Sequence, residues 1–315
     1  MRLKTWFARH GRQYGPLMAL IGLSLVLWML TPHFLTLENL LNVVEQTTII
    51  AIIAAGMTFV IISAGIDLSV GSIVALSGVA MATALRSGWA LPSALLVGTT
   101  TGLACGLLNG VLVTRGRLPP FIATLGMMSV ARGAALMFTD GRPVSGFSEA
   151  FRRLSTGDVL QVPSPVIVMA VIYLLSHILL TKTQFGRYVY AIGGNEEAAV
   201  LSGVNVSRVK TLVYGQCGML SGLAAILLTA RLNSAQPIAG MMYELDAIAA
   251  TVIGGTSLLG GEGTIFGTLV GALIIGVLRN GLNLIGTPSF TQQVVIGSVI
   301  IVSVLLDMLL RAGRK

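Results

Sequence analysis

One carboxylate, Asp67, lies between two long aliphatic runs in the segment AGIDLSVGS. At bilayer depth, an acid without a partner costs on the order of 2.5–3.5 kcal/mol. Asp is a preferred helix N-cap, because its side chain accepts a hydrogen bond from a backbone N–H two or three residues further on, here Ser69 or Val70. The positive end of the helix dipole also favours its charge. We therefore predict that Asp67 caps a broken helix; the alternative is that it binds substrate on a pathway through the protein.

Other polar side chains also interrupt apolar runs. Arg279 and Asn283 are four residues apart, so they share one face of a helix. Residues of this kind face either a bundle interior, where they bond to other helices, or an aqueous path. Both alternatives stay open for each residue, although the group as a whole favours a polar path. The candidates for a pathway or a helix cap are Asp67, Ser69, Asn109, Asp246, Asn280 and Asn283. Further polar residues in apolar runs are Glu45, Gln46, Arg132, Glu244 and Arg279.

Motifs for catalysis and for metal binding are missing from the sequence. No Gly-Lys dipeptide occurs, so the chain lacks the phosphate loop that places a lysine on the phosphates of ATP. His10, His33 and His177 are scattered, and none has another ligand at metal-site spacing. Cys105 and Cys217 fall inside apolar runs, which is typical of packing residues. We predict no catalytic residue, no metal and no cofactor.

The composition is that of a membrane protein. Hydrophobic residues make up 54% of the 315 residues and charged residues only 10%, whereas soluble domains carry about a quarter charged residues. Apolar runs long enough to cross a hydrocarbon layer of about 30 Å recur along the chain. The net charge of +8 is spread over short loops, which argues against a nucleic-acid partner. The sequence predicts an all-α, polytopic integral membrane protein that forms a single domain over residues 1–315.

Hydropathy and helix breakers divide this domain into about ten spans. They lie near 16–31, 42–64, 69–85, 92–113, 119–138, 164–181, 211–230, 246–260, 264–285 and 291–310. Gly-rich polar breaks within 42–85 and 246–285 make broken or re-entrant helices an alternative there. The segments GIDLSVG at Gly65 and GTSLLGG at Gly255 match at three positions, with Asp67 opposite Ser257. An internal repeat and a chance match both explain this similarity.

The basic residues predict the orientation. With the N-terminus in the cytoplasm, thirteen Lys and Arg residues fall inside and five fall outside, the latter being Arg86, Arg142, Arg152, Arg153 and Arg231. This distribution obeys the positive-inside rule and places both termini in the cytoplasm.

Two connections are longer than a turn requires, an outer one at 139–163 and an inner one at 182–210. In the inner connection, Asn195 suits an N-cap, acidic residues occupy the next turn and Gly203 suits a helix end. These signals predict a short helix over 196–202. This helix either rests on the bilayer surface or docks into a cytoplasmic protein. Because it lies outside the spans, we expect Ala199→Trp to leave folding intact. We also expect three side chains to face the cytoplasm, namely those of Ala198, Val200 and Leu201.

Several long segments resemble the permease subunits of bacterial sugar ABC importers, most closely those for ribose. The matching stretches are AAGMTFVIISAGIDLSVGS, PPFIATLGMM, GRYVYAIGGNEEAAVLSGVNV, RLNSAQPIAG, YELDAIAATVIGGTSLLGGEGTIFGTLVGALIIGVLRNGLNLIG and QQVVIGSVII. The resemblance implies a permease homodimer in the inner membrane, surrounded by lipid, with a cytoplasmic ATPase subunit and a periplasmic sugar-binding protein as partners. It implies docking of the binding protein near Arg142, Arg152 and Arg153. The ATPase-coupling residues that it implies are Gly194, Asn195, Glu196, Glu197, Ala198, Ala199, Leu201, Gly203 and Val204.

Two other functional classes compete with an importer subunit. An ion-coupled secondary transporter would use intramembrane acids such as Asp67 or Asp246, and an integral membrane enzyme would need a catalytic group that no motif provides. The missing ATP motif together with a docking-type inner loop favours the importer subunit, since a stand-alone carrier needs no such loop.

Overall fold

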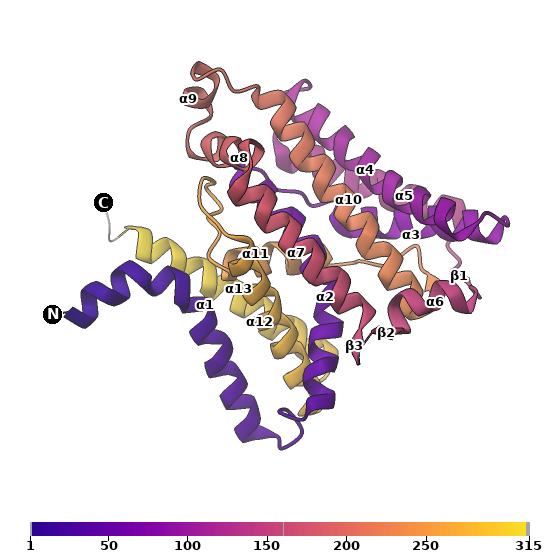
Figure 1. The fold of residues 1–315 in the computed structure, drawn as a ribbon, viewed down its shortest axis with the longest axis horizontal. Coiled ribbons are helices and arrows are strands. Elements are labelled where there is room, and N and C mark those ends of the chain that lie inside the picture. Colours follow the sequence, from indigo (N-terminus) through magenta and orange to yellow (C-terminus); the bar gives the residue numbers. More distant parts are fainter. Residues whose placement is uncertain (1, 160, 313–315) are drawn as a thin grey trace.

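The computed structural model describes residues 2–159 and 161–312, and regular structure in them is almost entirely helical (Figure 1). This confirms the all-α prediction. Arg314 and Lys315, two of the basic residues assigned to the cytoplasm, lie outside the described residues. The helices are α1 (Arg2–Leu30), α2 (Leu37–Ile62), α3 (Val70–Arg86), α4 (Leu91–Thr114), α5 (Pro120–Thr139), α6 (Glu149–Thr156), α7 (Ser164–Lys182), α8 (Gln184–Gly194), α9 (Glu196–Leu201), α10 (Val206–Leu232), α11 (Tyr243–Ile253), α12 (Ile265–Leu284) and α13 (Ser289–Ala312).

Six helices in the described part of the chain are long and apolar enough to cross a membrane, namely α2, α4, α5, α7, α10 and α12. Shorter apolar helical stretches lie at 15–30, 70–86 and 289–302. One predicted span needs correction. Over 246–260 the chain is not a continuous helix, because α11 has only 11 residues and reaches roughly 16 Å. A non-helical segment rich in glycines with positive φ, including Gly255 and Gly260, follows it, so this part is a broken helix.

Helix α2 forms the centre of the molecule. Nearly every residue from Thr47 to Ile62 is buried, as expected for a helix that is apolar on all sides. Helices α7, α10, α11 and α12 surround it (Figure 1). The hydroxyl of Tyr173, in α7, donates to the carbonyl of Ala51 at 2.9 Å and fixes one of these neighbours.

Helices α4 and α10 pack with their backbones in contact. Glycines recur every fourth residue along α4, and an added Cβ at Gly102 would lie 2.3 Å from the carbonyl oxygen of Gly218. At Gly106 it would lie 2.2 Å from the carbonyl oxygen of Tyr214. Small residues permit this approach, which supplies the van der Waals contact that holds helices together in lipid.

Short strands and one helix gather at the end of the molecule opposite α9 (Figure 1). Strand β1 (Val144–Ser145) pairs antiparallel with β4 (Ser234–Ala235), and β2 (Asp158–Val159) pairs with β3 (Val162–Pro163). The connection at 139–163 is therefore a structured cap. Its helix α6 is anchored by Phe151, whose side chain is fully buried.

We expect Gly102→Ala to destabilise the protein, because the new methyl group overlaps the backbone of α10. Overpacking of this kind costs about 1–3 kcal/mol, which would lower Tm in detergent. Gly22→Ala is the matched control, since Gly22 is also helical but nothing lies within 4 Å of an added Cβ. That change should leave Tm unchanged or raise it, because Ala favours a helix over Gly. Equal Tm values for the two variants would contradict the close contact.

Candidate functional site

The Asp67 cluster comprises Asp67, Ser69 and Asn109, at the break between α2 and α3. Asp67 is fully buried, and its Oδ1 accepts hydrogen bonds from the backbone N–H of Ser69 at 2.9 Å and from the Ser69 hydroxyl at 2.5 Å. The predicted bond to the Ser69 N–H is thus present. Helix α3 begins one residue later, at Val70, so Ser69 itself occupies the N-cap position.

Asn109 joins this cluster from α4. Its Nδ2 donates to the Ser69 hydroxyl at 2.8 Å. Within the described residues, Asp67 Oδ2 and Asn109 Oδ1 are buried and have no hydrogen-bond partner. Because Asp67 is fully buried and bonded to Ser69, this conformation favours a role at the helix break over contact with a substrate.

Two further helices hold the same break at the carbonyl of Ile66. Thr124 Oγ1 of α5 lies 3.4 Å from this oxygen, although its shorter bond, at 2.9 Å, goes to the carbonyl of Pro120, and the Tyr214 hydroxyl of α10 donates at 3.5 Å. The break therefore lies where α3, α4, α5 and α10 meet. A movement of any of these helices would change its geometry.

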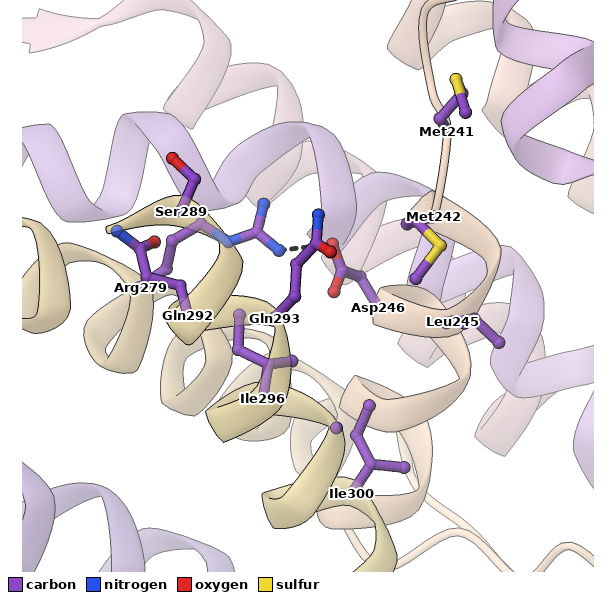
Figure 2. Close-up of a pocket in the computed structure, with 11 residues that line it drawn as sticks. Met241, Met242, Leu245, Asp246, Arg279, Ser289, Gln292, Gln293, Ile296 and Ile300 are labelled. Atoms are coloured by element: carbon purple, nitrogen blue, oxygen red, sulfur yellow. Dashed lines mark hydrogen bonds and ion pairs between the residues drawn. The ribbon is translucent and has the colours of Figure 1, made fainter. Parts of the chain in front are cut away.

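A second polar site contains Asp246 of α11 and Arg279 of α12. Arg279 Nη2 lies 2.9 Å from Asp246 Oδ2; the Asp246 side chain is 6% exposed and the Arg279 side chain 41%. The pair borders a cavity of about 320 Å³ between α11, α12 and α13 (Figure 2). Other residues that line it are Met241, Met242, Leu245, Ser289, Gln292, Gln293, Ile296 and Ile300.

The two asparagines near Arg279 belong to neither site. Asn280 is buried and exchanges two amide hydrogen bonds with Asn39 of α2, at 2.9 and 3.0 Å. Asn283 Oδ1 accepts from Gln292 Nε2 at 2.7 Å, across the turn between α12 and α13. The six candidate residues thus lie in separate places, and Asn280 fits the alternative of bonding between helices.

The inner connection contains the expected short helix. Asn195 Oδ1 accepts from the N–H of Ala198 at 2.9 Å, and Gly203 follows the helix with φ +81°. Val200 and Leu201 are exposed, the latter by 89%, but Ala199 is only 4% exposed. The expectation that Ala199→Trp would leave folding intact is wrong, because this methyl group packs into the main core.

Helix α8 was not expected from the sequence. Its signals are a cap at Thr183, whose Oγ1 accepts from the Gly186 N–H at 3.3 Å, and apolar residues at Phe185, Val189 and Ile192. That spacing is typical of an amphipathic helix. Because α8 is short and ends in glycines, the sequence pattern favours a loop for its residues.

Helix α8 connects α9 to the two helix breaks. At Gly193 there is no room for a Cβ, because the carbonyl oxygen of Ile62, the last residue of α2, lies against it. The hydroxyl of Tyr190 donates to the carbonyl of Gly263 at 2.7 Å, and the N–H of Gly261 donates to Ile62 at 2.9 Å. The ends of α2 and α8 and the loop between α11 and α12 therefore form one contact region.

The similar segments at Asp67 and Ser257 also share a local geometry. Ser257 Oγ accepts from the N–H of Leu259 at 3.3 Å, two residues on, as Asp67 Oδ1 does from Ser69. Both side chains thus stabilise a break that precedes a helix. Whether the two segments are a repeat stays a prediction.

The arginines of the outer connection are exposed. Arg153 forms an ion pair with Glu149, at 2.6 Å and one turn away, in which both side chains are more than 70% exposed. Such a pair contributes little to stability. Arg142 and Arg152 lie on the same cap, so the expected positive surface is partly neutralised.

The described residues offer no metal site. Within 2–159 and 161–312, no three His, Cys, Asp or Glu side chains lie close enough to hold an ion. Cys105 and Cys217 are both free and buried.

We expect Asp67→Asn to be mild, because an amide oxygen can still accept the two bonds from Ser69. Asp67→Ala removes both and should cost about 1 kcal/mol or more, visible as a lower Tm in detergent. If the parent protein and the Asp67→Asn variant have equal Tm values and the Asp67→Ala variant has a clearly lower one, the structural role is supported. If the Asn and Ala variants are equally stable and both abolish transport, Asp67 is a ligand instead.

Comparison with known proteins places the chain among transport permeases. Residues 39–304 match the family described as "Branched-chain amino acid transport system / permease component". No solved structure matches the chain.

Its relatives are aligned over nearly their whole length. The ribose import permease protein RbsC of Bacillus subtilis (strain 168) is 50% identical, over 94% of this chain and 92% of the relative. RbsC of Escherichia coli (strain K12) is 48% identical, over 92% of each. The D-allose transport system permease protein AlsC of Escherichia coli (strain K12) is 40% identical, over 96% of this chain and 94% of the relative. The chain belongs to this family of transport-system permease components.

Proposed function

We propose that this chain is the membrane permease subunit of a binding-protein-dependent ABC importer that moves a monosaccharide, most specifically ribose, into the cytoplasm. The single observation that carries the proposal is 50% identity to a ribose import permease over 94% of the chain. The identity to these permeases supports residence in a bacterial inner membrane. The six long apolar helices support a chain that crosses the membrane several times.

The energy source in this proposal is a separate ATPase subunit, and the transport unit is a permease homodimer around one pathway. The absence of an ATP-binding motif from the sequence supports a partner. Leu201, with 89% of its surface exposed at the tip of α9, supports a docking point, since so apolar a tip is better covered by protein than by water.

The orientation proposed is cytoplasmic for α8, α9 and both termini. The cap formed by β1, β4 and α6 then faces the periplasm, where the sugar-binding protein would dock near Arg142, Arg152 and Arg153. Arg115, Arg117 and Lys182 would lie on the cytoplasmic side, in agreement with the positive-inside rule.

Contacts from α9 inward suggest how ATP hydrolysis would reach the spans. Movement of α9 would displace α8, whose Gly193 packs on the end of α2. The Asp67 cluster lies a few residues beyond that end and includes Asn109 of α4, while α5 and α10 contact the adjacent carbonyl of Ile66. Hydrolysis on the partner would thereby tilt several helices around one break.

The alternative of ion-coupled transport through Asp67 or Asp246 receives no support. Asp67 is fully buried, with its Oδ1 bonded to Ser69, and Asp246 is paired with Arg279.

In proteoliposomes, we expect the chain alone to hydrolyse no ATP and to accumulate no ribose. Addition of the ATPase subunit, the sugar-binding protein, ribose and ATP should restore both activities. The measurement is uptake of labelled ribose together with release of phosphate. Uphill uptake by the chain alone, driven by a proton or sodium gradient, would refute an importer subunit.

Leu201→Glu should weaken binding of the ATPase subunit, because it places a charge where an apolar tip enters a groove. Loss of a central anchor costs about 2 kcal/mol, or roughly 30-fold in Kd. Arg152→Glu on the opposite cap is the control and should leave ATPase binding unchanged. Unaltered co-purification and normal transport by the Leu201→Glu protein would show that α9 is only a connector.

A further inference from the structure

An irregular segment at 236–242, between β4 and α11, runs beside two apolar helices. An added Cβ at Gly71 of α3 would lie 2.1 Å from the carbonyl oxygen of Gly240, and Arg132 of α5 donates to the carbonyls of Pro237 at 2.8 Å and Ala239 at 2.7 Å. Irregular backbone at membrane depth occurs only inside protein or beside a water-filled cavity. Met241 and Met242 at the end of this segment are exposed.

These two methionines line the cavity that also contains Asp246 and Arg279. Arg279 lies within the apolar helix α12, yet 41% of its side chain is exposed. A charged side chain exposed to lipid is costly, so such residues face a bundle interior or a water-filled cavity, or reach the interface from a helix end. Figure 2 shows the amide of Gln293, from α13, directed at the ion pair. A partly exposed charge beside a polar-lined cavity thus points to an aqueous pocket.

The chemistry of this pocket suits a neutral polyol. Because the charges of Asp246 and Arg279 cancel, the pocket offers no net attraction to an ion. The carboxylate accepts, the guanidinium donates, and Ser289 and Gln293 do both, which matches the hydroxyl groups of a sugar. A volume of about 320 Å³ is at the small end of ligand pockets.

We infer that the pocket between α11, α12 and α13 binds a single monosaccharide ring within the permease. This inference rests on the proposed function and adds a substrate site to it. Asp246, Arg279 and Gln293 hold the hydroxyl groups, while Met241 and Ile296 pack against the apolar face of the ring. The sugar released by the binding protein therefore has a binding step in the membrane before it reaches the cytoplasm.

Cysteine labelling in the reconstituted importer tests the pocket directly. The Gln293→Cys protein should react with a hydrophilic thiol reagent, and D-ribose at about ten times its Kd should slow the reaction roughly tenfold, because the fraction of unoccupied sites falls by that factor. Val294→Cys is the matched control, since Val294 is 68% exposed on the adjacent face and should stay unlabelled in lipid. Background is low because both native cysteines are buried.

The functional arm uses Gln293→Leu, with Gln216→Leu in the apolar groove between α4, α7 and α10 as control. Gln293→Leu should reduce ribose uptake about fivefold without changing ATP hydrolysis stimulated by the binding protein; Gln216→Leu should change neither. A merely structural fault would lower both rates.

The two proposals can fail separately. If the parent importer takes up no sugar, the proposed function is wrong, whereas labelling with a panel of monosaccharides still tests the pocket. If position 293 resists labelling, or no monosaccharide protects it, the pocket inference is overturned even though transport is normal.

Discussion

The close approach of α4 and α10 is the contact on which the rest of the molecule depends. In lipid there is no hydrophobic drive between helices, so association relies on van der Waals contact, and glycines let the two backbones meet. Gly102 and Gly106 face the backbone of α10 with no room for a side chain. The same approach places Asn109 beside Ser69 and the Tyr214 hydroxyl beside the carbonyl of Ile66. A packing constraint therefore positions the polar cluster at the helix break.

Two broken helices meet at one end of this core. The break after α2 and the loop before α12 bond to each other through Gly261 and Ile62, and α8 packs against both. Glycines with positive φ permit these turns, because an L side chain rarely adopts that backbone conformation. Short contacts between backbones transmit displacement better than flexible side chains do. In the proposed importer, α8 and α9 would be the mechanical input to the spans.

Sequence patterns were informative where the interaction is local. The cap at Asn195 and the bond from the Ser69 N–H to Asp67 join residues two or three positions apart, so residue type and order predicted them, although Ser69 and not Asp67 holds the N-cap position. The partners of Asn280 and Arg279 are 241 and 33 residues away, and only the fold brings them together. Hydropathy predicted a span over 246–260 because the segment is apolar on average, and the glycines at 254, 255 and 260 indicated a possible break without showing that the helix ends at Ile253. Burial of Ala199 was missed for the same reason, since it depends on the helices that pack around α9.

Two intramembrane acids illustrate how environment separates structural from ligand roles. Asp67 is fully buried and accepts a hydrogen bond from Ser69 at the start of α3. This bond offsets the cost of burying the carboxylate only while the break keeps its geometry. Asp246 is also buried, but its partner Arg279 opens onto a cavity, where the pair keeps both donors and acceptors available to a ligand. An uncompensated charge at that place would attract ions and retain them. In the inferred site, a compensated pair would bind hydroxyl groups only through hydrogen bonds of modest net strength, which would let a sugar enter from one side of the membrane and leave on the other.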